Sequence, residues 1–329
     1  MIKDRITRRA FSKNAIAAAA ALAVPRIARA QNYPTRPIRF ILPFAAGGVA
    51  DITSRLAAEK LGEKLGQRFV VENQPGPGGI AAARTVLTAS SDGYTLGLVT
   101  NGTSISVAIY NALPFDPVKD FSTISTLGYF DLIFASSSES KFKTLDDFIK
   151  AARAQPGKLN VGTINVGGTQ NLGAELFKSS AGLNFQIIPY RGTPEILVAL
   201  LRDDVQLMVD FYAPMKGMLV EKKIRALATS GVERLSYMAD VPTVAQAGVP
   251  GYEVTSWNGI FAPHGAPPDI ISTLNKAMHE ILVIPEVKSR YLDLGVEAKA
   301  SSPEELMARL KGDITKWAAV IEKAGIPKQ

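Results

Sequence analysis

The segment IRFILPFAAGGVADITSRLAAEKLGEKLG, residues 38–66, places a predicted strand, a glycine loop and a predicted helix in direct succession. Its first five residues are a short apolar run of the kind that forms a buried strand. After Gly47 and Gly48, apolar residues recur three to five positions apart along one helical face, and Gly66 follows as the expected C-terminal cap. This order of strand, loop and helix is typical of α/β proteins.

The same order recurs along the rest of the chain. Short apolar runs predict further strands, and helical periodicity, often opened by proline, predicts further helices. We therefore expect an α/β fold with a largely parallel sheet, divided into two lobes of the kind that traps a ligand in the cleft between them. The predicted strands lie at residues 69–72, 94–99, 159–163, 185–189, 205–209 and 224–229, and the predicted helices at residues 80–89, 145–154, 194–201, 268–282, 285–294 and 303–324, with a further helix through Leu172 and Phe177.

The net charge of +7 is concentrated in the first 30 residues, which carry seven basic residues and one acid, whereas the remaining chain carries 30 basic and 29 acidic residues. A basic start, an apolar run at residues 15–24 and a small-residue cleavage site at residues 28–30 predict an export signal peptide over residues 1–30. Arg8 and Arg9 favour the twin-arginine route, with an ordinary secretory signal as the alternative. Because the rest of the chain is nearly neutral, nucleic-acid binding is not expected.

The residue inventory disfavours several classes of active site. There is no Cys, which excludes a thiol nucleophile, a disulfide and a thiolate-bound metal. The sequence contains neither the G-x-S-x-G nucleophile elbow nor the H-E-x-x-H metal motif. Its two histidines, His264 and His279, are expected on the surface. We therefore expect no catalytic residue, no metal and no cofactor.

Three loops follow the carboxyl end of a predicted strand and precede a helix, which is where open α/β sheets bind ligands. Those at residues 43–51 and 165–171 contain paired glycines, which let the backbone N–H groups of a helix start approach an anion. Neither loop spells the G-x-G-x-x-G or P-loop pattern, so nucleotide binding is disfavoured. The third, residues 189–194, carries Arg191 as a candidate carboxylate clamp.

Each of these features also has a purely structural interpretation. The alternative for the first loop is a tight turn, with Asp51 stabilising the first turn of its helix. The alternative for Arg191 is a solvated surface residue, as most Arg residues are. Asp210, which directly follows the strand at residues 205–209, either meets a ligand or accepts N–H groups at the next helix start.

Short motifs stand in one fixed order over nearly the whole chain after residue 30. They are Tyr33-Pro34-Thr35-Arg36-Pro37-Ile38-Arg39, Pro43-Phe44 with Gly47-Gly48, Asp51 and Arg55, Val71-Glu72-Asn73-Gln74-Pro75-Gly76, Asp92-Gly93-Tyr94-Thr95-Leu96, Pro189-Tyr190-Arg191-Gly192, Asp240-Val241-Pro242-Thr243-Val244, Gly248-Val249-Pro250-Gly251-Tyr252 and Trp257-Asn258-Gly259-Ile260-Phe261-Ala262-Pro263. In this succession the chain resembles the Bug-type extracytoplasmic solute receptors, the substrate-binding proteins of tripartite tricarboxylate transporters.

The resemblance implies a type II periplasmic binding protein with two α/β lobes, a hinge and a central ligand cleft. Residues 31–130 together with 231–329 would form lobe one, and residues 131–230 lobe two. The two glycine loops would hold a ligand carboxylate through backbone amides and ordered water. The expected ligand-binding residues are Phe44, Ala45, Ala46, Gly47, Gly48, Asp51, Asn101, Thr103, Asn165, Gly167, Gly168, Thr169, Gln170, Asn171, Arg191 and Asp210.

The resemblance further implies a non-catalytic, monomeric receptor in the periplasm. It would capture a small organic acid for the membrane permease subunits of a tripartite tricarboxylate transporter. The alternatives are a periplasmic enzyme acting on organic acids and a ligand-sensing receptor for a signalling partner. Asn171 stands where many relatives carry His, so the ligand preferences of those relatives are not transferred.

Overall fold

A computed structural model describes residues 33–329 of the chain. The chain divides into two units, Met1–Thr35 and Arg36–Gln329. The signal peptide predicted for residues 1–30 lies outside the described residues. Within residues 33–329, no helix has both the length and the apolar character that crossing a membrane requires.

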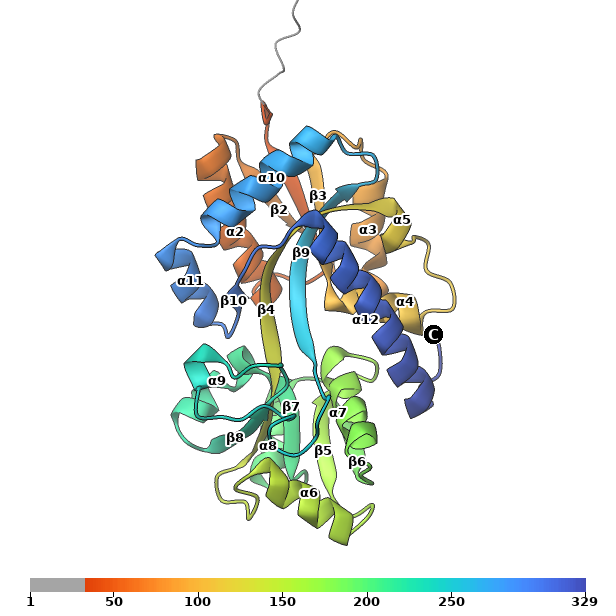
Figure 1. Cartoon of the computed structure of the whole chain (residues 1–329), viewed down its shortest axis with the longest axis vertical. Helices are drawn as coiled ribbons and strands as arrows, with labels where there is room; N and C mark the ends of the chain where they lie inside the picture. Colours follow the sequence, from red (N-terminus) through yellow and green to blue (C-terminus); the bar gives the residue numbers. More distant parts are fainter. Residues whose placement is uncertain (1–32) are drawn as a thin grey trace, which may run out of the picture. The chain divides into compact units, whose positions relative to one another are not determined.

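The unit Arg36–Gln329 is built on one sheet with the strand order β2-β1-β3-β9-β4-β7-β5-β6, and β8 and β10 also pair with β4 (Figure 1). Helices lie along both faces of this sheet (Figure 1). The strands are β1 (Ile38–Leu42), β2 (Phe69–Asn73), β3 (Thr95–Thr100), β4 (Phe121–Ser137), β5 (Asn160–Ile164), β6 (Gln186–Tyr190), β7 (Leu207–Phe211), β8 (Ile224–Thr229), β9 (Thr255–Pro263) and β10 (Glu297–Ala298).

The sheet is mixed, which corrects the expectation of a largely parallel one. Parallel pairing joins β1 to β2 and β3, and joins β5 to β6 and β7. Between these two groups, the long strands β4 and β9 pair antiparallel. β4 changes partner along its length, because it pairs with β9 as far as Asp131 and with β7 from Leu132 onward.

All of the predicted elements are present, and their predicted bounds differ from the observed ones by at most two residues. The predicted bounds are exact for β1, β8, α6 (Leu145–Ala154) and α12 (Pro303–Ala324). Gly66 caps α2 (Val49–Leu65) with a left-handed φ of 73°, and its N–H donates to the carbonyl oxygen of Gly62. The helices are α2 (Val49–Leu65), α3 (Ile80–Leu87), α4 (Asn101–Ile109), α5 (Pro117–Asp120), α6 (Leu145–Ala154), α7 (Thr169–Ser180), α8 (Thr193–Leu201), α9 (Tyr212–Val220), α10 (Pro268–Ile281), α11 (Pro285–Leu292) and α12 (Pro303–Ala324).

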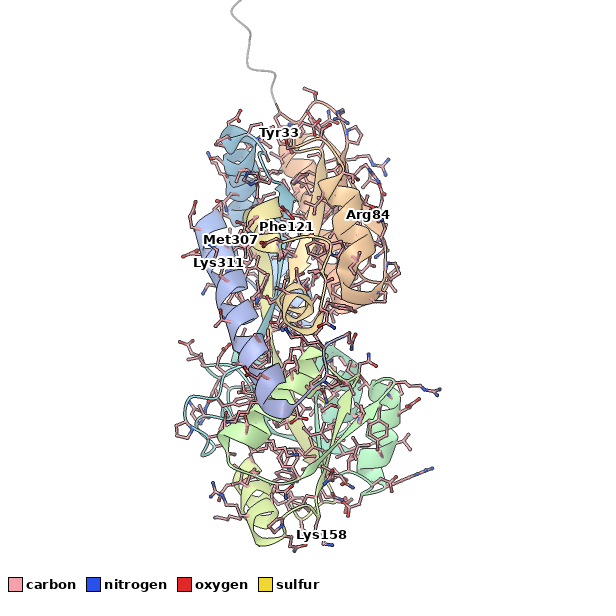
Figure 2. The ribbon with its side chains drawn as sticks, turned by 90° about the vertical axis from the view of Figure 1, so that its right-hand side faces the viewer. Tyr33, Arg84, Phe121, Lys158, Met307 and Lys311 are labelled. Atoms are coloured by element: carbon pink, nitrogen blue, oxygen red, sulfur yellow. The ribbon has the colours of Figure 1, made fainter. Side chains whose placement is uncertain are left out.

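The C-terminal helix α12 connects the two groups of parallel strands. Leu306 and Leu310, in its first half, pack in the core beside β1 and β3. Trp317 and Ile321, in its second half, pack in the core that contains β5 and β7. Figure 2 shows this helix running from the level of Phe121 down to the part of the molecule that ends near Lys158. The apolar residues that recur along this helix therefore face the core.

Candidate functional site

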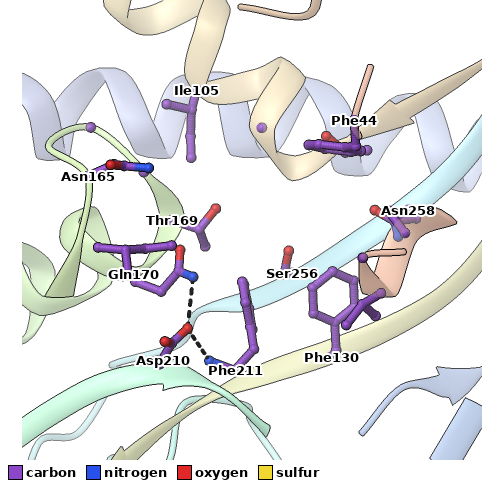
Figure 3. Close-up of a pocket in the computed structure, with 18 of the residues that line it drawn as sticks. Phe44, Ile105, Phe130, Asn165, Thr169, Gln170, Asp210, Phe211, Ser256 and Asn258 are labelled. Carbon is purple, nitrogen blue, oxygen red and sulfur yellow. Dashed lines mark hydrogen bonds between the residues drawn. The ribbon is translucent and has the colours of Figure 1, made fainter. Parts of the chain in front are cut away.

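A pocket of about 910 Å³ opens where the carboxyl ends of β1, β3, β5 and β7 converge. Thr100, Ile164 and Asp210 line it from the ends of three of these strands. Residues of β4 and β9, among them Phe130 and Ser256, form another side (Figure 3). Open α/β sheets bind ligands at this edge, so the pocket is the candidate ligand site.

The first glycine loop connects β1 to α2 along the pocket. Gly47 adopts a left-handed φ of 88°, and Gly48 is the extended N-cap of the helix. The N–H of Gly47 donates to Asp51 Oδ2 over 2.9 Å, and Arg55 and Asn73 also donate to the Asp51 carboxylate. Burial raises the pKa of Asp51, but these hydrogen bonds more than offset it, so its pKa lies below the ordinary value. Asp51 therefore braces the loop as a buried anion.

The second glycine loop, between β5 and α7, repeats this geometry. Gly167 has a φ of 77°, and Gly168 is the extended N-cap, with φ −75° and ψ 164° against −80° and 170° at Gly48. The N–H of Gly167 donates to Asn171 Oδ1 over 3.0 Å, so Asn171 holds the position in this loop that Asp51 holds in the first. A neutral amide braces one loop and a carboxylate the other.

Both loops present helix N-termini to the same pocket. The lining includes Gly48, Val49 and Ala50 at the start of α2, and Gly168 and Thr169 at the start of α7. N–H groups in the first turn of a helix have no intrahelical acceptor, and the helix dipole places partial positive charge there. Two such termini facing one cavity form a site suited to an anion such as a carboxylate.

A chain of hydrogen bonds fixes the hydroxyl of Thr169 within this site. The indole Nε1 of Trp317 donates to Asn101 Oδ1 over 2.7 Å, and Asn101 Nδ2 donates to Thr169 Oγ1 over 3.0 Å. An indole N–H can only donate, so it sets which end of the amide faces Thr169. The Thr169 oxygen therefore accepts from Asn101, and its own O–H remains to donate into the pocket that it lines.

We expect Thr169→Val to weaken carboxylate binding by about ten-fold or more, because one hydrogen bond to a charged group contributes on the order of 1.5 kcal/mol or more. Thr169→Ser keeps the hydroxyl and is expected to bind nearly as the natural chain does. Isothermal titration calorimetry of the two variants provides the measurement. Equal affinities for the valine and serine variants would show that this hydroxyl does not contact the ligand.

Asp210 is the acidic side chain of the pocket and is almost fully buried. Its Oδ1 accepts from Gln170 Nε2 over 3.0 Å and from the N–H of Phe211 over 2.8 Å (Figure 3). Its Oδ2 accepts from Thr193 Oγ1. Burial raises the pKa of Asp210, and these three hydrogen bonds offset part of the rise. The structure thus agrees with the acceptor role at a helix start, since Phe211 is the N-cap of α9.

The predicted site residues differ in where the structure places them. Nine of them line the pocket: Phe44, Gly47, Gly48, Asn165, Gly167, Gly168, Thr169, Gln170 and Asp210. Asp51, Asn101 and Asn171 lie behind the lining and brace it, and Thr103 Oγ1 accepts the N–H of Thr100 in the capping box of α4. Ala45, Ala46 and Arg191 are exposed and do not line the pocket.

Sequence reasoning missed most of the apolar wall. Ile105, Ile109 and Tyr110 come from α4 and its end, Phe130 from β4, and Asn258 from β9. Of these residues only the polar Asn258 lies in a quoted motif, and no local signal placed any of them at the pocket, because their approach to it depends on strand pairing that a single sequence does not reveal. Phe211 alone carried a local signal, since it directly follows Asp210 at a strand end.

Residues 53–326 match the family described as "Tripartite tricarboxylate transporter family receptor". The BugT protein of Bordetella pertussis is 29% identical to this chain over 94% of each sequence.

Two solved structures of Rhodopseudomonas palustris proteins are also similar. Rpa4515, solved with adipate, is 32% identical, with a TM-score of 0.76 over 90% of this chain and 99% of that one. MatC, solved with bound malate, is 31% identical, with a TM-score of 0.72 over 88% of this chain and all of that one.

Proposed function

The chain belongs to the tripartite tricarboxylate transporter receptor family, and from this premise we propose that it is a periplasmic solute-binding protein that delivers a small carboxylate to membrane permease subunits. The fold is that of the periplasmic binding proteins of this family, as its similarity to Rpa4515 and MatC shows. The relatives that carry adipate and malate support a carboxylate as the ligand. Export through a signal peptide at residues 1–30 and action as a monomer are part of this proposal.

One observation carries the proposal: two glycine loops with the same geometry direct the N-termini of α2 and α7 at one pocket. The first loop belongs to the proposed lobe of residues 31–130 and 231–329, and the second to the lobe of residues 131–230. The change of partner along β4 between Asp131 and Leu132 supports this division. A ligand that contacts both loops would favour the closed arrangement of the lobes through its higher affinity for that state.

The experiment is a thermal-shift and calorimetric survey of the mature protein with mono-, di- and tricarboxylates. A ligand that binds only the folded state at 100 times its Kd adds about 2.7 kcal/mol to the free energy of unfolding. We expect at least one carboxylate to raise Tm by several degrees and to remain chemically unchanged when followed by NMR. Failure of every carboxylate to bind would contradict the receptor proposal, and consumption of a bound acid would favour an enzyme.

A further inference from the structure

One wall of the pocket is apolar. Ile105 and Ile109 of α4 line this wall together with Phe130 and Phe211. The rings of Phe130 and Phe211 pack edge to face, with their centroids 5.0 Å apart (Figure 3). Aromatic and aliphatic side chains thus cover much of the surface away from the two glycine loops. Such a wall contributes affinity only when apolar surface of the ligand is removed from water against it.

Exposed apolar side chains gather at the same place. Phe44 is 39% exposed, Ile52 39% and Val166 54%, and all three line the pocket. Exposed apolar groups that gather around a cavity mark a binding surface, whereas those scattered singly do not. These three come from both sides of the pocket, since Phe44 and Ile52 flank the first glycine loop and Val166 lies in the second. The opening itself is therefore adapted to an apolar body.

The charges of the lining favour one carboxylate and disfavour a second. Among residues 33–329, no Lys, Arg or His side chain lines the pocket, and Asp210 contributes an acid. The helix N-termini of α2 and α7 supply the partial positive charge of the lining, and a carboxylate that lies between the two glycine loops uses both of them. A second carboxylate would be buried without a cationic partner and in the presence of Asp210, and burying an unpaired charge is costly.

The cavity is large enough to admit an aromatic ring. The cavity measures about 910 Å³, which lies near the upper end of the roughly 300–1,000 Å³ that ligand pockets span. In Figure 3 Phe44 lies above and Phe130 below, with Ser256 at a level between them. A flat ring can lie against these aromatic side chains in the offset or edge-to-face arrangements that aromatic pairs prefer.

We propose that the ligand of this site is an aryl monocarboxylate, with its carboxylate at the two glycine loops and its ring against Phe130, Phe211 and the α4 face. The inference rests on the proposed function, because it names the class of carboxylate that the receptor takes. It separates this chain from relatives whose ligands carry two carboxylates.

The test compares acids that share one ring and differ in one substituent. We expect 4-methylbenzoate to bind at least about ten-fold more tightly than terephthalate, in which a carboxylate replaces the methyl group, and more tightly than adipate or malate. Calorimetry on the mature protein gives each Kd. Tighter binding of any of these dicarboxylates overturns this inference and leaves the receptor function standing, whereas absence of binding by every acid overturns the receptor function and this inference with it.

A charge-introducing variant tests the same inference from the side of the protein. Val166→Lys places the missing cation in the lining at a position exposed enough for the fold to tolerate the change. We expect it to improve terephthalate binding about ten-fold relative to 4-methylbenzoate. Val283→Lys is the matched control, because Val283 is 61% exposed and outside the pocket, and it should leave the ratio unchanged. An unchanged ratio in the Val166 variant would show that lack of a cation does not set the preference.

Discussion

Replacing Gly48 with leucine is expected to weaken carboxylate binding by at least about 100-fold while leaving the free energy of unfolding nearly unchanged. Gly48 has φ −80° and ψ 170°, a conformation that any L-residue adopts, and a Cβ added there meets no atom within 4 Å. The new side chain would occupy the lining at the N-terminus of α2, where the carboxylate approaches. A 100-fold loss corresponds to about 2.7 kcal/mol of binding free energy.

Calorimetry and thermal unfolding of the Gly48→Leu variant check this expectation together. Gly312→Leu is the matched control, because Gly312 lies on α12 outside the pocket and its Cβ also meets nothing within 4 Å. Gly47 and Gly168 are less suitable for this test, because a side chain at either position would also strain the folded structure. Gly47 has a left-handed φ of 88°, and a Cβ on Gly168 would come within 3.3 Å of the carbonyl oxygen of Asn165. Unchanged affinity in the Gly48 variant would remove the first glycine loop from the binding site.

The second large effect is a dependence of stability on pH that originates at Asp131. This residue is buried where β4 leaves β9 and joins β7. Burial, aided by the nearby carboxylates of Glu253 and Glu297, raises the pKa of Asp131 to about 7, although hydrogen bonds from Thr255 and Gly231 oppose the rise. The folded chain therefore holds a proton at pH 4–7 that the unfolded chain releases.

Because the folded state binds more protons in this window, the contribution of Asp131 to the free energy of unfolding is largest below about pH 4 and decreases as the pH rises toward 7. We expect Asp131→Asn to remove this fall and to raise the free energy of unfolding at pH 8 by on the order of 3 kcal/mol. Chemical denaturation at several pH values measures both curves.

The exposed Asp240 offers the matched control for this prediction. Asp240→Asn makes the same chemical change without removing a buried carboxylate, so its pH profile should follow that of the natural chain. Parallel profiles for the natural chain and the Asp131 variant would show that the Asp131 carboxylate is not protonated preferentially in the folded state.

Local signals predicted the first strand, loop and helix well. The apolar run at residues 38–42, the glycines and the cap at Gly66 each act within a few residues, and the structure has each element in its place. β4 had no such signal. Its sequence from Phe121 to Ser137 is rich in Ser and Thr and does not alternate, because nearly the whole strand is buried. Its polar groups form hydrogen bonds with residues far along the chain. At Thr126, for example, the backbone N–H donates to Ser301 Oγ and the side-chain hydroxyl donates to the carbonyl oxygen of Lys299.

The sequence by itself determined the α/β character of the chain, the two glycine loops and the suitability of their helix starts for an anion, because capping, periodicity and dipoles are local properties. Only the tertiary structure decided which further residues meet at those loops. Trp317, Asn101 and Thr169 are joined by hydrogen bonds across more than 200 positions, and Phe130 reaches the pocket through the pairing of β4 with β9 and β7. Such contacts arise from packing between distant segments, and they determine which part of a ligand, beyond its anionic group, the pocket can accommodate.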